Sequence, residues 1–189
     1  MKPLLVIGGA SFGRLVSVLV EECGRTFAGY VDDFNTGGGI VGTRADLGTG
    51  IAPTGFDLVL GVGYKDLAAR WRVYEEAVAR GFHFPTLVHP RATVSRHARV
   101  AEGCLVMAGA SVDAFASLEQ ACVLWPGAIV SHDSRIGRNT FLSPNATVCG
   151  FVNLGHSSFL GAGSVVVDHA TLPEGTFAKA CSRIGTRNG

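Results

Sequence analysis

An aliphatic residue recurs at every sixth position through the second half of the chain, and this period restricts the fold more than any other feature. The series runs from Val88 to Ile184 without an insertion, and its seventeen members are Val, Leu or Ile apart from Ala178. A second series lies four residues after the first. Fifteen of its sixteen positions, from Ala92 to Ser182, hold Ala, Cys, Ser or Thr, and Val152 is the exception.

This double period predicts an all-β parallel β-helix over residues 83–189. Each hexad supplies one short strand and one turn, so three hexads close one triangular coil. Each aliphatic residue is then expected to point inward and to stack on its counterpart three hexads later, about 4.8 Å away. The small residue lies where the chain turns tightly. Cys104 and Cys122 belong to the small series and are therefore predicted to be inward-facing residues, not catalytic thiols.

Residues 1–82 lack the six-residue period and have the pattern of an α/β domain. Three short apolar runs are expected to be strands, namely residues 4–7, 27–31 and 56–62. Two segments are expected to be helices, namely residues 15–22 and 65–80. The Gly-rich residues 35–50 are predicted to be a loop or a weak strand pair. Alternation of strand and helix implies a small parallel, Rossmann-like sheet, and Pro85 and Pro90 mark its junction with the β-helix.

Composition and charge exclude several classes of protein. The net charge is +1 and no run of Lys or Arg occurs, so a nucleic-acid partner is not expected. No apolar stretch approaches the roughly 20 residues of a membrane span, and the N-terminus does not have the pattern of a signal peptide. The 5 cysteines form no C-x-x-C pair. A cytoplasmic protein without zinc or a disulfide framework is expected.

Several motifs together resemble one family. They are the Gly-rich first turn, Asp32-Asp33, residues 87–90 (Leu-Val-His-Pro), Ser131-His132-Asp133, Cys149-Gly150 and residues 161–166 (Gly-Ala-Gly-Ser-Val-Val). Over nearly its whole length the chain resembles bacterial nucleotide-sugar acetyltransferases of the sialic-acid O-acetyltransferase family, which includes N-acetyltransferases for UDP- or dTDP-linked 4-amino-6-deoxy sugars. The resemblance implies a left-handed hexapeptide β-helix, acetyl-CoA as co-substrate, no metal, a homotrimer, and a role in cell-surface polysaccharide biosynthesis.

His132 is the predicted general base of this reaction. Acyl transfer from a thioester needs a neutral amine or a partly deprotonated hydroxyl, and imidazole titrates near working pH. His132 follows Val130 by two residues and so falls in a turn, where side chains reach the outside. The resemblance assigns it the role of base, and Asp133 the role of raising its basicity. The alternative is a surface histidine without a function.

Gly150 follows His132 by three hexads, which places it on the same face one coil further on. The resemblance gives its backbone N–H the role of holding the thioester carbonyl, as in an oxyanion hole. The alternative is a glycine that a tight turn requires, and the two roles are compatible.

The first turn is a near match to the dinucleotide fingerprint G-x-G-x-x-G. Ala10 stands where the middle glycine would let the backbone approach a pyrophosphate, which weighs against NAD. The resemblance implies that the nucleotide sugar is bound by Ala10, Ser11, Phe12, Asp32 and Asp33. It implies that acetyl-CoA is bound by Phe141, Gly161, Ala162 and Gly163. Phe12 and Phe141 depart from the family, because its members often carry histidine at the first place and some of them use a histidine at the second.

Proteins with other functions share parts of this sequence pattern. A γ-type carbonic anhydrase shares this kind of helix but needs histidines five residues apart, and the 6 histidines here have gaps of 6, 8, 35, 24 and 13. An N-acetyltransferase acting on a nucleotide-linked 4-amino-4,6-dideoxy sugar is favoured. The alternatives are an O-acetyltransferase on a sialic-acid-like sugar and a non-catalytic nucleotide-sugar-binding protein. The presence of His132, Asp133 and Gly150 favours an enzyme.

Overall fold

The computed structural model describes residues 1–186, which form two compact units. The first is Met1–Leu87 and the second begins at Val88. The first unit is α/β and the second contains only strands and turns, so the predicted fold class is confirmed.

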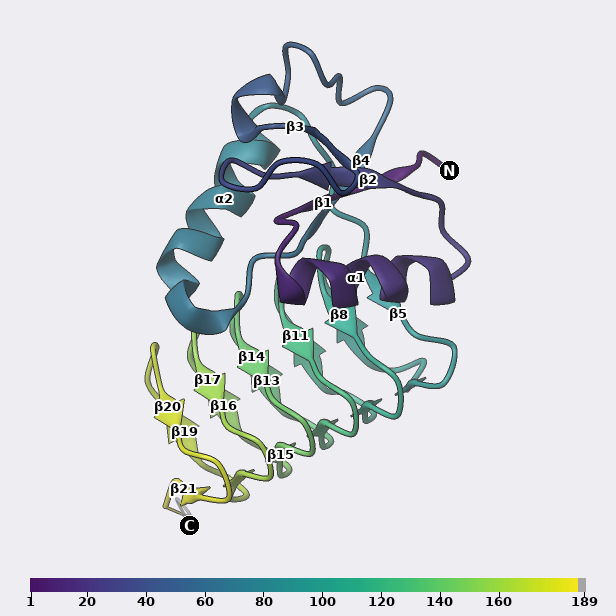
Figure 1. Cartoon of the computed structure of the whole chain (residues 1–189). Coiled ribbons are helices and arrows are strands. Elements are labelled where there is room, and N and C mark those ends of the chain that lie inside the picture. The colour runs from purple at the N-terminus through teal and green to yellow at the C-terminus, as the bar shows by residue number, and fades with distance from the viewer. Residues whose placement is uncertain (187–189) are drawn as a thin grey trace. The chain divides into compact units, whose positions relative to one another are not determined.

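The first unit is built on a four-stranded parallel sheet in the order β3-β2-β1-β4 (Figure 1). Its strands are β1 (Leu4–Ile7), β2 (Phe27–Val31), β3 (Ile40–Gly42) and β4 (Asp57–Leu60). Every residue of β1 and β4 is buried, as expected of parallel strands that are covered on both faces. Helix α1 (Ser11–Glu22) packs across β1, β2 and β4. Helix α2 (Leu67–Ala79) follows β4 through the 3-10 turn η2 (Tyr64–Asp66).

Two segments differ from the expectation from sequence. Helix α1 begins at Ser11 and not at residue 15, because the glycine turn after β1 runs directly into the helix. Within residues 35–50 the chain forms β3, which pairs in parallel with β2, and the 3-10 turn η1 (Arg44–Asp46). The segment therefore contributes one edge strand to the sheet and is neither a plain loop nor a strand pair.

Close contact between backbones explains the glycines of the first turn. A Cβ on Gly13 would lie 1.8 Å from the carbonyl oxygen of Gly8, and a Cβ on Gly61 would lie 2.8 Å from the same oxygen. Helix α1 can therefore approach the ends of β1 and β4 only because these positions lack side chains, which is the role of the third glycine in the dinucleotide fingerprint.

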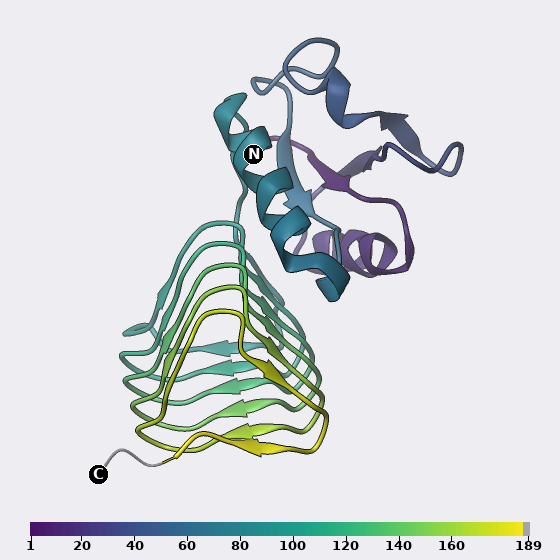
Figure 2. The ribbon, with the colours of Figure 1, turned by 90° about the vertical axis from the view of Figure 1, so that its left-hand side faces the viewer.

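The second unit is a parallel β-helix with three flat sides (Figure 2). Up to residue 186 it contains seventeen two-residue strands, the first of which spans the division between the units. Their bounds are β5 (Leu87–Val88), β6 (Thr93–Val94), β7 (Arg99–Val100), β8 (Leu105–Val106), β9 (Ser111–Val112), β10 (Ser117–Leu118), β11 (Val123–Leu124), β12 (Ile129–Val130), β13 (Arg135–Ile136), β14 (Phe141–Leu142), β15 (Thr147–Val148), β16 (Asn153–Leu154), β17 (Phe159–Leu160), β18 (Val165–Val166), β19 (Thr171–Leu172), β20 (Phe177–Ala178) and β21 (Arg183–Ile184).

The strands stack into three parallel sheets whose partners are three hexads apart, as Val130 and Val148 are. The three sheets run in the orders β20-β17-β14-β11-β8-β5, β21-β18-β15-β12-β9-β6 and β19-β16-β13-β10-β7. The second residue of every strand is the aliphatic residue that defines the six-residue period. The predicted coil of three hexads is confirmed.

The inward-facing residues of the coils form one continuous core. Most of the aliphatic series is fully buried, and burying one Val, Leu or Ile side chain is worth about 1.5–3 kcal/mol. Val88, at the start of the series, is 38% exposed because it belongs to the first strand. Cys104 and Cys122 are buried with their Sγ atoms facing backbone carbonyls, so the prediction that they are small core residues is confirmed.

In the part of the chain that the structure describes, no helix combines the length and the apolar character needed to cross a membrane.

Candidate active site

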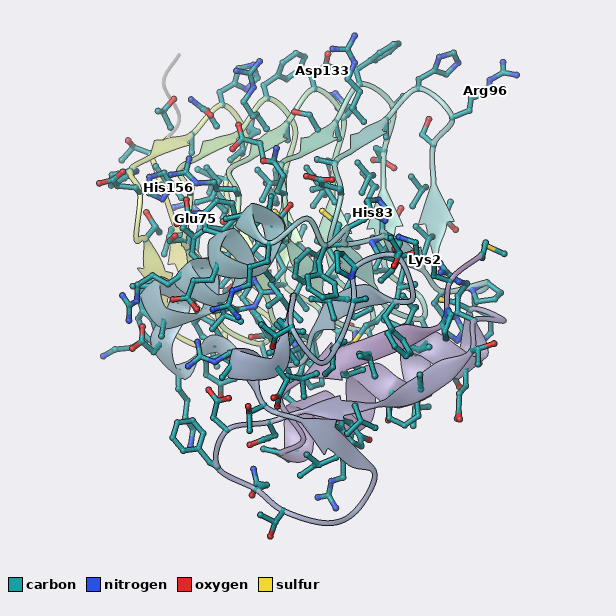
Figure 3. The ribbon with its side chains drawn as sticks, turned by 90° about the horizontal axis from the view of Figure 1, so that it is seen from above. Lys2, Glu75, His83, Arg96, Asp133 and His156 are labelled. Carbon is teal, nitrogen blue, oxygen red and sulfur yellow. The ribbon has the colours of Figure 1, made fainter. Side chains whose placement is uncertain are left out.

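The turn between β12 and β13 carries His132, and hydrogen bonds of Ser134 hold this turn to the next coil. Ser134 is buried beneath it, and its hydroxyl donates to the carbonyl oxygen of Cys149 at 2.7 Å and accepts from the N–H of Val152 at 3.1 Å. The His132 side chain is 53% exposed, as predicted for a turn position. Figure 3 shows its neighbour Asp133 on the outer edge of the coils, in a row of side chains that stand along this corner.

His132 and Asp133 form a hydrogen-bonded pair. Nδ1 of His132 lies 3.0 Å from Oδ2 of Asp133, and the contact is made between adjacent residues because Asp133 has a positive φ of 57°. The carboxylate accepts the Nδ1–H, which leaves a lone pair on Nε2. Within residues 1–186, Nε2 of His132 has no hydrogen-bond partner. The histidine is thus oriented as a base with its reactive nitrogen free.

Gly150 lies directly against the imidazole of His132. A Cβ built on Gly150 would lie 2.9 Å from Cε1 and 3.0 Å from Nε2 of His132. Gly150 does not have a positive φ, so the space taken by the ring, and not the backbone conformation, requires glycine here. Its N–H donates to no group among the described residues. A base nitrogen and an unused amide donor are therefore brought to one place.

A series of contacts leads from His132 to three further residues. The ring of Phe151 lies 5.1 Å from that of His132 at an interplanar angle of 88°, and it stacks on His169 at 4.8 Å. His169 in turn pairs with Asp168, with 3.2 Å between Nδ1 and Oδ2. The motifs in the sequence do not point to these residues. The signal that would have found them is the coil length, since Phe151 and His169 follow Asp133 by one coil and by two coils.

Asp32 ties the first turn of the α/β unit to the end of β2. It is buried, and its carboxylate accepts four hydrogen bonds, from the N–H groups of Gly9, Phe34 and Asn35 and from the side-chain amide of Asn35. Burial alone would raise the pKa of Asp32, but these hydrogen bonds outweigh it and lower the pKa to about 2. The chain's own groups thus occupy both carboxylate oxygens.

Asp33 faces a different neighbour. Its carboxylate accepts from the backbone N–H of Arg44 at 2.8 Å and from Nε of Arg44 at 2.5 Å. Burial opposes ionisation here too, but the hydrogen bonds and charge of Arg44 lower the pKa of Asp33. Arg44 also lies 3.3 Å from Glu76 on α2. Asp33 is therefore held as an anion at the carboxyl end of β2.

Ala10, Ser11 and Phe12 form the start of α1, beside Asp32. Ala10 is the N-cap residue and makes no side-chain capping hydrogen bond, and the first turn has no acidic residue. The positive end of the helix dipole is therefore not neutralised by the helix itself, which suits an anionic group. The structure thus gathers the five residues predicted to bind the nucleotide at one edge of the sheet.

The residues predicted to bind acetyl-CoA lie elsewhere on the single chain. Phe141, in β14, is buried in an aromatic row, 6.0 Å from the ring of Trp125 and 6.1 Å from that of Phe159. Residues 161–163 form the turn between β17 and β18, a different corner from that of His132. A Cβ on Gly161 would lie 2.5 Å from the amide nitrogen of Ala180, so coil stacking already requires this glycine. Within residues 1–186, no cluster of His, Cys, Asp or Glu is arranged to hold a metal ion.

The fold and the His132 site define a class, the hexapeptide-repeat acyltransferases that carry a Rossmann-like N-terminal domain. No protein-family profile and no curated protein sequence matches the chain. Among solved structures, the acetyltransferase domain of PglB from Neisseria gonorrhoeae is 31% identical, with a TM-score of 0.91 over 99% of this chain and 93% of that one. The chain therefore belongs to the family of bacterial nucleotide-sugar acetyltransferases.

Two further structures show what relatives bind. The PglB domain in complex with acetyl coenzyme A is 32% identical, with a TM-score of 0.87 over 95% of this chain and 89% of that one. PerB from Caulobacter crescentus was solved in complex with CoA and GDP-perosamine. It is 29% identical, with a TM-score of 0.91 over 99% of this chain and 90% of that one.

Proposed function

We propose that this protein transfers the acetyl group of acetyl-CoA to the amine of a nucleotide-linked 4-amino-4,6-dideoxy sugar. The observation that carries the proposal is the placement of Nε2 of His132 over Gly150, whose amide donor is unused. The relatives solved with acetyl coenzyme A and with GDP-perosamine support the choice of donor and acceptor. We place the reaction in the cytoplasm.

In the proposed reaction, the amine attacks the thioester carbonyl directly. Nε2 of His132 takes a proton from the amine as the new C–N bond forms, and Asp133 stabilises the resulting imidazolium. The carbonyl oxygen becomes an oxyanion and accepts a hydrogen bond from the N–H of Gly150. When the C–S bond breaks, the CoA thiolate leaves and takes the proton from His132.

A covalent acetyl-enzyme is not part of this proposal. Cys149 is the cysteine next to Gly150 in the chain, and its thiol forms no hydrogen bond with a histidine among the described residues. It lacks the base that would activate a cysteine nucleophile. The kinetics should therefore be sequential, with both substrates bound before either product leaves.

The nucleotide is proposed to bind at the carboxyl edge of the first sheet. The uncapped start of α1, at Ala10, Ser11 and Phe12, suits a phosphate. Asp33 provides a fixed carboxylate that can accept a hydrogen bond from a base or a ribose hydroxyl. Asp32 acts indirectly, by holding the backbone of this edge in place.

The acetyl-CoA site is proposed to be completed by a second copy of the chain. On one chain, residues 161–163 and His132 lie at different corners of the β-helix. A homotrimer about an axis parallel to the axis of the β-helix would set one corner of each copy beside a different corner of its neighbour. The flat sides of the coils suit such packing (Figure 2).

A substrate screen tests the proposed function. The enzyme is incubated with acetyl-CoA and, separately, UDP-, dTDP- and GDP-linked amino sugars, and release of free thiol is followed. Matched nucleotide sugars with a hydroxyl in place of the amine serve as controls. Thiol release with an amino sugar alone is expected. Thiol release only with the hydroxyl sugars would show that the enzyme is an O-acetyltransferase. Thiol release with neither kind of sugar would contradict the proposal.

A further inference from the structure

The ring of Phe151 separates two histidines at the corner that carries the proposed base. One side of the ring meets the His132 imidazole, 5.1 Å away and nearly perpendicular. The other side stacks on His169, 4.8 Å away and tilted by 23°. His169 is itself held by Asp168. Phe151 is thus fixed between the base and a second His–Asp pair.

Neither burial nor backbone preference explains a phenylalanine at this position. Phe151 is 50% exposed, and its φ of 57° lies in the left-handed region, which a bulky side chain rarely adopts. At the other two corners the equivalent positions are mostly occupied by small or polar residues that tolerate this conformation, such as Asn139, Asn145 and Gly163. An aromatic ring in this backbone conformation costs stability, so it needs another reason.

We propose that Phe151 is a positioning residue for His132. Three contacts then restrict the imidazole. Asp133 holds Nδ1, Gly150 leaves room for the ring, and Phe151 closes one side, so that Nε2 stays next to Gly150. His169 backs the Phe151 ring and keeps it from turning away. This inference rests on the proposed function, in which Nε2 of His132 takes the proton of the amine.

The test replaces the ring while keeping apolar volume. Phe151→Leu should lower kcat about three- to tenfold, the range expected when one aromatic contact is lost. The KM for either substrate should change less than twofold, because the imidazole orientation matters in the transition state. Phe151→Tyr, which keeps the ring, should restore most of kcat. His169→Ala should give a smaller loss of kcat in the same direction.

Phe115 offers a matched control. It occupies the same corner two coils earlier, with a positive φ of 66° and 65% exposure, and its ring lies 5.8 Å from that of His97. Phe115→Leu should leave kcat unchanged, and melting temperatures of all variants should show that they are folded. Equal losses of kcat in Phe115→Leu and Phe151→Leu would overturn the inference.

A double-mutant cycle separates this inference from the proposed function. In a His132→Ala background, adding Phe151→Leu should cause no further loss of kcat, because Phe151 acts through the imidazole. An additional three- to tenfold loss there would show that Phe151 does not act through His132. If His132→Ala itself keeps full turnover, the proposed function fails. If His132→Ala loses turnover while Phe151→Leu does not, the inference alone fails.

Discussion

The imidazole of His132 occupies the space in which a side chain at residue 150 would lie. A Cβ on Gly150 would be 2.9 Å from Cε1 of His132, closer than such atoms approach in proteins. The two residues meet because they are one coil apart at the same corner, with the N–H of Phe151 donating to the carbonyl oxygen of His132 at 3.2 Å. A glycine one coil away thus sets where the base can stand.

Gly150→Ala should therefore reduce activity without unfolding the protein. The atoms nearest to the new methyl group belong to the side chain of His132 and not to the backbone, so we expect the ring to be displaced while the backbone keeps its place. A displacement of about 1 Å at a catalytic group can cost about 10²-fold, so we expect kcat to fall by ten- to a hundredfold. Steady-state kinetics and a thermal melt check this. An unchanged kcat would show that the ring position is not critical.

Gly155→Ala serves as the control for Gly150→Ala, because its new methyl group would meet backbone and not a side chain. A Cβ at Gly155 would lie 2.3 Å from the amide nitrogen of Glu174, which belongs to the backbone of the next coil and cannot turn aside. This variant should lower the melting temperature clearly more than Gly150→Ala does. Equal stability of the two variants would contradict the distinction between side-chain and backbone contact.

His132→Ala should lower kcat by about 10²–10⁴, as removal of a general base does. The KM values should change much less, because the imidazole contributes mainly in the transition state. Asp133→Asn keeps a hydrogen-bonding group and should give a smaller loss. High pH should partly restore His132→Ala by supplying neutral amine. Near-full turnover of a folded His132→Ala variant would exclude His132 as the base.

Asp32→Asn should destabilise the first unit at neutral pH and leave little difference in acid. The pKa of about 2 in the folded protein lies below the unfolded value of about 3.9. The carboxylate therefore stabilises the fold above about pH 4, and this contribution is lost as the pH falls toward 2. Urea denaturation should show a loss of about 1–3 kcal/mol at pH 7. The loss should shrink markedly at pH 2.5; an equal loss at both values would refute this account.

Asp33→Ala should raise the KM for the nucleotide sugar and leave the KM for acetyl-CoA unchanged. Arg44→Ala breaks the same ion pair while keeping the carboxylate, so it separates binding by Asp33 from mere loss of the pair. If Asp33 contacts the nucleotide, its variant should have the larger effect on this KM. Equal effects of the two variants would mean that the ion pair, and not the nucleotide, needs Asp33.

The proposed homotrimer should be detectable in dilute solution. Light scattering should give about three times the chain mass of 19.7 kDa, and the mass should persist on dilution to assay concentrations. Because the proposed acetyl-CoA site needs two copies, monomers should be inactive. A stable monomer with full activity would rule out a shared site.

The six-residue period predicted the β-helix and its register because it reports directly which residue of each strand faces the core. The same register placed Gly150 one coil from His132, and the structure brings the two into contact. The sequence does not reveal the start of α1, because Gly13 disfavours a helix by propensity, whereas in the fold its close approach to Gly8 requires a glycine there. Strand β3 has three residues, too few to show a periodic pattern.

The contacts between the rings of His132, Phe151 and His169 could not be predicted from the sequence for a different reason. The period fixes the backbone position of Phe151 and His169, but whether their rings stack depends on side-chain rotamers in neighbouring coils. The residues predicted to bind acetyl-CoA are also hard to assign from the sequence alone. Their glycines satisfy the packing of the coils whether or not a ligand is present, as at Gly161, so the residue type alone does not reveal a site.

The uninterrupted stacking of the coils gives the corner of His132 a translational symmetry. Moving three hexads along the chain returns to the same corner, one strand spacing of about 4.8 Å further along the axis. The proposed catalytic group needs only two successive coils. It consists of a histidine, the acidic residue after it and a glycine one coil later. The height of the base along the helix can therefore change in fixed steps by substitution of a few residues, with the scaffold unchanged. A fold of this kind can adapt to acceptors of different length by relocating its chemistry along the axis.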